Sequence, residues 1–318
     1  MGVKMRRYFI TLWLSLSLFT DITFAQEHGA DSSETHHLQN SAIEFRMLLT
    51  RAWQGDADAQ NAVGVIFATG NGAQLADRGW PVVKNLEEAA SWFFAAASSG
   101  HAEAQINLGM MYEQGEGNPR DMKLASYWYE QAAKQGNPQA QNIMGVVFGT
   151  GRGVAKDMAR AIYWFRRAAQ QKDVDAQVNL GRLYETGNGV PRDFRAALRW
   201  YRGAAEAGDP KAQFFMGVLF EQGRHVIQDF QLAAHWYLKA AEQGDLLSQY
   251  NLGILYARGR GVPRDYIQGY AWLNVAASQG YLRARLNRNV IARRMSAQHL
   301  LEAQALSRAV VSQIYRSG

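Results

Sequence analysis

The sequence has 318 residues and contains no cysteine, and beyond its first 25 residues it has no apolar run long enough to span a membrane. The absence of cysteine excludes disulfide bonds and a lipid anchor on a cysteine, so packing alone must hold the fold together. Charged residues make up 19% of the chain and hydrophobic residues 47%, a balance that excludes disorder for most of its length. We therefore expect a continuous apolar core.

Sequence motifs that carry chemistry are missing as well. The chain contains no Ser-x-x-Lys, Gly-x-Ser-x-Gly or His-Glu-x-x-His, the patterns of penicillin-recognising enzymes, serine hydrolases and zinc proteases. Its 7 histidines are scattered. The stretch from Gly151 to Lys156 looks like a phosphate-binding loop, but no strand precedes it and the same turn recurs along the chain. We predict no enzyme activity, no catalytic residue, no metal and no cofactor.

The first 25 residues differ from the rest of the chain. Three basic residues precede an apolar run over residues 8–19, and small residues stand three and one positions before a cleavage point after Ala25. The run of 12 residues is shorter than the ~20 that a membrane-spanning helix needs. We predict a signal peptide over residues 1–25 and a mature protein that is periplasmic or secreted. Removal of this signal peptide lowers the formal net charge from +6 to +4. A charge this small gives little support to a nucleic-acid partner.

What the chain does have is a tryptophan every 36 residues. The six members are Trp92, Trp128, Trp164, Trp200, Trp236 and Trp272. Each stands in the same local pattern, so one structural unit is copied in tandem and neighbouring copies are expected to stack alike. We assign residues 55–279 to six such repeats.

Each copy predicts two helices joined by a glycine turn. In the copy that begins at Gly100, Ala104, Leu108 and Tyr112 form one helical stripe, and a wider apolar stripe runs over residues 125–133. An aspartate before each second helix is expected to cap it; these are Asp121, Asp157, Asp193, Asp229 and Asp265. Glycine ends four of the second helices, but Lys172 takes its place in one copy, where we expect a strained or differently closed turn.

Glycine also recurs inside the first helices, where it costs ~1 kcal/mol relative to alanine. The column contains Gly64, Gly109, Gly145, Gly181, Gly217 and Gly253. We predict that the second helix approaches so closely that no Cβ fits, with its tryptophan lying against the glycine. Replacing a tryptophan with alanine should then cost ~3–5 kcal/mol.

The repeated pattern resembles the Sel-1-like repeat family, which is related to the tetratricopeptide repeats. The residues that carry the resemblance in one copy are Ala176, Leu180, Gly181, Tyr184, Gly187, Gly189, Asp193, Ala197, Trp200, Ala204, Ala205 and Gly208. The resemblance implies an all-α fold, an α/α superhelical solenoid of six helix-turn-helix repeats of about 36 residues. It also implies an adaptor role, in exported bacterial members for signalling, envelope assembly or host contact. A cysteine-rich subset is linked to penicillin binding, and the lack of cysteine separates this chain from it.

Three segments flank the repeats. Residues 26–40 are polar and predicted to be a disordered linker, residues 41–54 an N-terminal capping helix, and residues 280–318 a basic segment followed by a C-terminal capping helix. The basic segment carries Arg283, Arg285, Arg288, Arg293 and Arg294 without an acidic residue among them. These arginines are interpreted either as a contact for an anionic envelope polymer or as a solvated helix face.

The first repeat is longer than the others because residues 73–81 are inserted in it. An insertion in a solenoid projects from one face and is often where binding specificity lies. Arg78 and Trp80 are therefore candidates for partner contact, and a surface loop without a function is the alternative.

The face of the first helices opposite the stripe of Ala104, Leu108 and Tyr112 is largely apolar, although a solvent-facing side should be polar. Two columns at 36-residue spacing lie on this face, and a third lies beside them. The 106 column contains Ile106, Asn142, Val178, Phe214 and Tyr250, the 110 column contains Met110, Val146, Arg182, Val218 and Ile254, and the 107 column beside them contains Asn107, Ile143, Asn179, Phe215 and Asn251. Either neighbouring first helices cover these side chains, or they form a groove for a partner, with Phe214, Phe215 and Tyr250 at its centre. Ile106, Ile143 and Arg182 complete the candidate groove.

The leading hypothesis for function is a non-catalytic exported scaffold that mediates protein–protein interaction in the bacterial cell envelope. The alternative is an enzyme or ligand-binding protein of the cell wall that acts on peptidoglycan or β-lactams. Labelled penicillin and purified peptidoglycan would distinguish the two.

Overall fold

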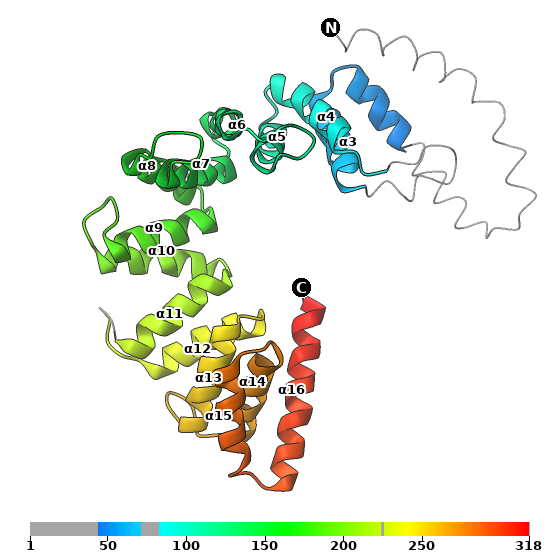
Figure 1. The fold of residues 1–318 in the computed structure, drawn as a ribbon. Coiled ribbons are helices and arrows are strands. Elements are labelled where there is room, and N and C mark those ends of the chain that lie inside the picture. The colour runs from blue at the N-terminus through cyan, green and yellow to red at the C-terminus, as the bar shows by residue number, and fades with distance from the viewer. Residues whose placement is uncertain (1–43, 71–82, 224–225, 318) are drawn as a thin grey trace, which may run out of the picture. The chain divides into compact units, whose positions relative to one another are not determined.

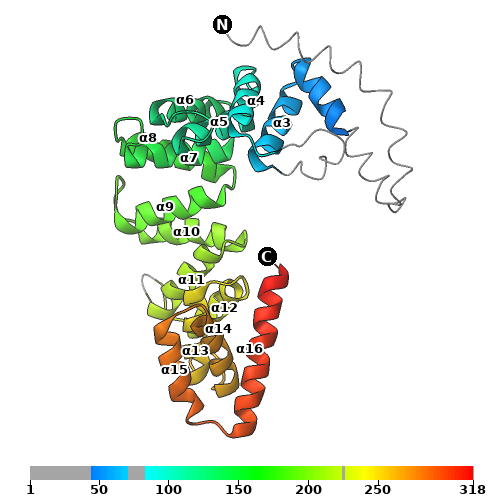
Figure 2. The same cartoon turned by 45° about the vertical axis from the view of Figure 1, so that its right-hand side comes forward.

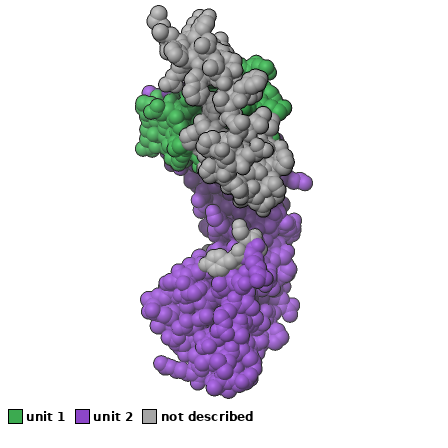
Figure 3. Space-filling view, turned by 90° about the vertical axis from the view of Figure 1, so that its right-hand side faces the viewer, with its two compact units in different colours: residues 1–121 green, residues 122–318 purple. Residues whose placement is uncertain are grey.

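A computed structural model describes residues 44–70, 83–223 and 226–317 of the chain. These residues form helices and turns without a strand, and the fold is an all-α solenoid of repeated helix pairs. The chain divides into two compact units, Met1–Asp121 and Met122–Gly318 (Figure 3). The signal peptide, the polar linker and the insertion around Arg78 and Trp80 lie outside the described residues.

The described helices of the first unit are residues 44–53, α3 (Ala57–Thr69), α4 (Leu86–Ser98) and α5 (Ala102–Gln114). The second unit contains α6 (Met122–Lys134), α7 (Pro138–Thr150), α8 (Met158–Gln170), α9 (Val174–Thr186), α10 (Phe194–Glu206), α11 (Pro210–Gln222), α12 (Phe230–Glu242), α13 (Leu246–Arg258), α14 (Tyr266–Ser278), α15 (Leu282–Ala292) and α16 (Ala297–Ser317). Consecutive helices pack as neighbours from α3 to α5 in the first unit and from α6 to α15 in the second (Figure 1). Odd-numbered helices from α3 to α13 are the first helices of the repeats, and even-numbered helices from α4 to α14 are the second.

Side-chain caps fix where the helices begin. The predicted aspartate caps are confirmed at α8, α10, α12 and α14, where the carboxylate accepts a backbone N–H from the first turn. The first helices have caps too, which the sequence reasoning missed although Asp or Asn recurs at their starts. The capping residues are Asp56, His101, Asn137, Asp173, Asp209 and Asp245. A cap of this kind contributes ~1 kcal/mol.

The glycine column inside the first helices lies against an aromatic ring, but this ring is not the tryptophan. A Cβ added to Gly181 would stand 2.5 Å from Cε1 of Tyr201, and one added to Gly217 would stand 2.5 Å from Cδ1 of Tyr237. The prediction that the tryptophan faces the glycine was therefore wrong by one residue. In these two repeats the ring that follows the tryptophan points at the first helix, because successive helical residues are turned by about 100°.

The same pairing recurs along the array. Phe93 lies against Gly64 and Phe165 against Gly145, while in the last repeat the aliphatic Leu273 lies against Gly253. The tryptophans of the 36-residue ladder occupy a neighbouring position on the second helix. Four of them are less than one tenth exposed, namely Trp92, Trp164, Trp236 and Trp272, and the other two, Trp128 and Trp200, are half-buried.

Glutamine side chains tie neighbouring repeats of the second unit together. Nε2 of Gln213 in α11 donates to the carbonyl of Ala205 in α10 over 3.1 Å. Nε2 of Gln243 at the end of α12 reaches back to Gln213 Oε1 over 2.8 Å and to the carbonyl of Gly208 over 3.0 Å. We call this arrangement the glutamine clamp. It recurs at Gln171, which donates to Gln141 and Gly136, and at Gln279, which donates to Gln249.

The C-terminal end of the second unit carries two helices beyond the last repeat. Helix α15 packs against α14 and α13, whereas α16 packs against α14 and α12. Val310 of α16 lies against the apolar cluster that contains Trp236 and Trp272, and Asn274 donates to the Ser307 hydroxyl over 3.0 Å. Both views place α15 and α16 on different sides of α14 (Figures 1 and 2).

Candidate interaction surface

The three aromatic side chains of the predicted groove are half-buried. Phe215 stacks on Tyr201 of the preceding repeat, with ring centroids 5.1 Å apart. Phe214 lies 5.7 Å from Phe215 and 6.1 Å from Tyr237, measured between ring centroids. Both phenylalanines therefore contact the apolar core of the second unit with one face and solvent with the rest.

Tyr250 lies at a separate place, farther along the second unit. Its ring meets the edge of the Tyr281 ring at a centroid distance of 5.1 Å, and its hydroxyl accepts a hydrogen bond from Nδ2 of Asn287 over 3.4 Å. Tyr250 packs against the C-terminal cluster around Tyr270, whereas the two phenylalanines pack against the cluster around Trp236. The aromatic centre is thus divided between two apolar clusters.

The remaining groove candidates differ in accessibility. Arg182 is exposed and donates to Oδ1 of Asn179 over 3.2 Å, and Ile143 is half-buried. Ile106 is only 2% exposed, so including it in a partner groove was wrong. Its side chain belongs to the apolar core, unlike Val178, Phe214 and Tyr250 of the same column, which are half-buried.

The pairing of the 106 and 107 columns accounts for the phenylalanine that replaces asparagine. Nδ2 of Asn179 in the 107 column donates to Oδ1 of Asn142, the 106-column residue one repeat earlier, over 3.0 Å. In the next repeat Phe215 takes the place of Asn179, and Val178 takes the place of Asn142, in the same apolar cluster. A polar pair is thus exchanged for an apolar pair. The sequence signal was a match at a spacing of 37 residues, which reasoning along single columns missed.

Two buried tyrosines on second helices carry perturbed ionisation. The hydroxyl of Tyr201 donates to Oε2 of Glu185 over 2.8 Å, and that of Tyr237 donates to Oε2 of Glu221 over 2.6 Å. Burial, followed by the neighbouring glutamate, raises the pKa of both tyrosines well above the ordinary value. Each phenol therefore stays protonated and acts as a structural donor that fixes a second helix to its first helix.

The second helices present an exposed face with aromatic and basic side chains. Tyr127 and Tyr163 are about half exposed, at 51% and 50%. Arg167 donates to the Tyr163 hydroxyl over 2.9 Å and stacks over its ring. A depression of about 460 Å³ on α8 is lined by Ala159, Ile162, Tyr163, Arg166, Arg167 and Gln170. All its lining residues come from one helix, so it is a shallow surface feature.

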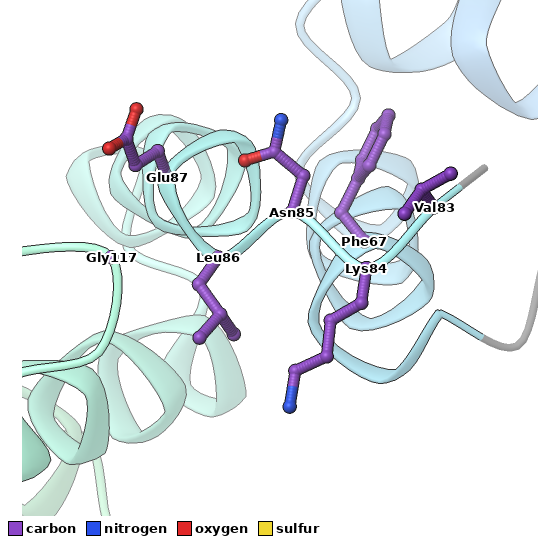
Figure 4. A pocket seen from close by; sticks show the side chains of 7 residues that line it. All are labelled: Phe67, Val83, Lys84, Asn85, Leu86, Glu87 and Gly117. Carbon is purple, nitrogen blue, oxygen red and sulfur yellow. The ribbon is translucent and has the colours of Figure 1, made fainter. Parts of the chain in front are cut away.

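A second depression, of about 670 Å³, lies in the first unit beside the start of α4 (Figure 4). Its lining residues are Phe67, Val83, Lys84, Asn85, Leu86, Glu87 and Gly117. Lys84 and Glu87 point away from each other (Figure 4), so the depression offers no set of converging polar groups.

The described residues contain neither a metal-binding cluster nor a membrane-spanning helix. Across residues 44–70, 83–223 and 226–317, no three His, Asp or Glu side chains gather closely enough to hold a metal ion. None of the helices in the described part of the chain combines the length and apolar character that crossing a bilayer requires. What the described surface offers is a set of helix faces rather than a pocket with converging functional groups.

Of the five arginines in the basic segment, one has a structural role. Nη1 of Arg288 donates to Oδ1 of Asn274 over 2.8 Å, and its guanidinium lies 6.0 Å from the Tyr270 ring centroid. Arg288 is half-buried, while Arg283, Arg285, Arg293 and Arg294 are exposed.

Comparison with known proteins identifies the repeat. A family model described as Sel1 repeat matches six consecutive segments, residues 57–101, 102–137, 138–173, 174–209, 210–245 and 246–281. The structure of c5321, a protective antigen of uropathogenic Escherichia coli strains with an SLR fold, is similar at 34% identity and a TM-score of 0.73. That match covers 85% of this chain but 56% of c5321, so the chain spans little more than half the length of that relative.

A second solved structure matches over its whole length. The Sel1 repeat protein of Oxalobacter formigenes is 33% identical, with a TM-score of 0.66, and the match covers 78% of this chain and 100% of that one. A search of curated proteins found no match.

Proposed function

The chain belongs to the Sel1 repeat family, and from this premise we propose that it is an exported, non-catalytic scaffold of the bacterial cell envelope. Sel1 repeat proteins generally mediate protein–protein interaction. The finer parts of the proposal are the compartment and the face that binds. The leader pattern over residues 1–25, with its cleavage point after Ala25, supports export.

The observation that carries the proposal is that some positions of the repeat are nearly constant and buried, whereas others vary and are partly exposed. The first-helix glycine, the ring that faces it and the buried glutamine of the first helix are nearly constant, and they pack inside the array. The 106 and 107 columns vary from repeat to repeat, and Phe214, Phe215 and Tyr250 on them are half-buried. When a partner binds, it can cover the part of such an aromatic side chain that is still exposed to water. We therefore place partner binding on the first helices of the second unit.

Capture from the envelope fraction of the parent organism tests the proposal. The mature protein, beginning at Gln26, is compared with a variant that carries Phe214→Ser and Tyr250→Ser. Phe215 is left unchanged because its stacking on Tyr201 makes loss of stability the expected result of its removal. The control variant carries Tyr127→Ser and Tyr163→Ser on the exposed face of the second helices.

The expected result is that the first-helix variant loses captured proteins and the control keeps them, with both variants folded by circular dichroism. Equal capture by the two variants would place binding elsewhere. Covalent labelling by a fluorescent penicillin, or soluble fragments released from peptidoglycan, would contradict a purely non-catalytic role. The N-terminal sequence of the protein recovered from the periplasm checks cleavage after Ala25.

A further inference from the structure

Helix α15 occupies the place of a seventh first helix. It begins at Leu282, 36 residues after the start of α13 at Leu246, and it packs against α14 and α13 as α13 packs against α12 and α11. Asn287 of α15 contacts Tyr250 one repeat earlier, the same relation that joins Asn179 to Asn142. Helix α15 therefore presents a surface that in earlier repeats receives the next first helix.

No further helix covers that surface in the described part of the chain. Leu282, Leu286 and Val290 are 54%, 56% and 52% exposed. Their spacing of four residues puts them on one face of the helix, and we call these three residues the terminal stripe. In the repeats before it, the residues that correspond to Leu282 are partly buried against the core, as Val174 and Leu246 are.

The residue that replaces glycine in α15 supports an open face. Asn289 stands in the column of Gly181, Gly217 and Gly253, where a glycine is needed because a ring of the second helix lies against it. Asn289 is exposed. Within the described residues no second helix packs onto α15, and α16 packs on α14 and α12 instead.

The charged side chains around the terminal stripe are all positive. Arg283, Arg285, Arg293 and Arg294 are exposed and have no ion pair among the described residues. By helical geometry, Arg285 lies on one side of the stripe and Arg283 on the other, and Arg293 and Arg294 follow the end of the helix. No Asp or Glu occurs between Asp265 and Glu302. A partner that carries apolar side chains along the centre of its binding face and carboxylates on both margins would therefore complement this surface.

We propose that the terminal stripe is a docking site for an amphipathic helix of a partner protein, with apolar residues at three- and four-residue spacing and acidic residues on both flanks. A helix fits because the repeats of this chain cover the same surface with a helix. An anionic polymer would use the arginines but would leave three apolar side chains in water. Leu286 continues the 106 column onto α15, but the stripe and the pair Phe214 and Tyr250 are changed in different variants. Either proposal can therefore fail while the other holds.

A displayed library of helix-biased peptides, selected on the mature protein, tests the docking site. Two variants are compared with the wild-type chain. The first carries Leu282→Ser, Leu286→Ser and Val290→Ser, and the second carries Arg283→Glu, Arg285→Glu and Arg294→Glu. All six side chains are exposed, so the thermal unfolding midpoint should stay within a few degrees of wild type. The variant Tyr127→Ser, Tyr163→Ser, at exposed positions of the second helices α6 and α8, serves as the matched control outside the site.

The expected result is enrichment of net-acidic sequences with helical apolar spacing, whose affinity falls about tenfold or more in both variants and not in the control. Peptides that bind the stripe variant as tightly as wild type would overturn the proposal, as would a selection that enriches no such sequence. Polyglutamate binding that depends on the arginines but not on the stripe would assign the site to a polyanion instead. Self-association abolished by the stripe variant would assign it to a second copy.

Discussion

Two turns occupy the same place in consecutive repeats, one between α8 and α9 and the other between α10 and α11. Of the two, only the α10–α11 turn has both a glycine in the left-handed conformation and a glutamine clamp. At the α10–α11 turn, Gly208 takes a left-handed φ of 103°, and Gln243 clamps both the Gly208 carbonyl and Gln213. At the α8–α9 turn, Lys172 is the only non-glycine residue with a positive φ, 66°, in the described part of the chain.

The clamp is missing from that same turn. Ala207 stands where Gln243 stands one repeat later, and Oε1 of Gln177 is buried without a hydrogen-bond partner among the described residues. The bond from Gln177 Nε2 to the Ala169 carbonyl is 3.5 Å long, compared with 3.1 Å for the corresponding bond of Gln213. Two independent departures from the repeat thus coincide at one joint. The comparison teaches that the array is not uniformly held and that the α8–α9 turn is its weakest described joint.

The largest effect is expected from a contact that the two regions share. Replacing Tyr201 or Tyr237 with alanine removes the ring against the first-helix glycine and the hydrogen bond to a glutamate. Each variant should lose ~3–5 kcal/mol of unfolding free energy, the range for truncating a buried aromatic residue. Urea denaturation of the mature protein measures this loss. A loss below ~1 kcal/mol in one variant only would show that the two repeats also differ in their cores.

A smaller effect is expected from breaking the closed turn. Gln243→Ala removes the donor from Gln213 Oε1 and from the Gly208 carbonyl and should cost ~1–3 kcal/mol. Gln171→Ala is the matched variant, since Gln171 makes the same two bonds to Gln141 and Gly136. Hydrogen exchange should increase at the α10–α11 turn in the first variant and at the α6–α7 turn in the second. Unchanged exchange at both turns would mean that the clamps contribute no stability.

The sequence predicted the repeated features of the fold but not which side chains contact each other. Period, helix pairs and aspartate caps follow from spacing along one chain, so they could be read directly. The ring against Gly217 was assigned to Trp236 instead of Tyr237, because the period does not say which of two adjacent side chains points inward. The match of Val178 with Phe215 joins different columns of different repeats. Such a match depends on the offset between neighbouring helices, which the single-column pattern does not contain.

Restoring the missing clamp should stabilise the weak joint. The backbone of Ala207, with φ −73° and ψ −7°, is close to that of Gln243, with φ −90° and ψ 7°, so a glutamine placed there can reach back in the same way. Ala207→Gln supplies a donor to Gln177 Oε1 and should add ~0.5–1.5 kcal/mol. In a Gln177→Ala background the gain should shrink to the contribution of the bond to the carbonyl of residue 172. An equal gain in both backgrounds would show that helix propensity, and not the clamp, is responsible.

The smallest effect is expected at Lys172 itself. A left-handed conformation costs a non-glycine residue roughly 1–2 kcal/mol, but glycine loses about 0.5–1 kcal/mol through the freedom of its unfolded state. Lys172→Gly should therefore gain less than ~1 kcal/mol, and Lys172→Ala, which keeps the strain, should gain nothing. A glutamine at position 207 would also donate to the carbonyl of residue 172, as Gln243 donates to Gly208. Because both changes act on one turn, the gains in stability from Lys172→Gly and Ala207→Gln should not add in the double variant. Strictly additive gains, measured by thermal unfolding, would show that the strain at Lys172 and the missing clamp are independent of each other.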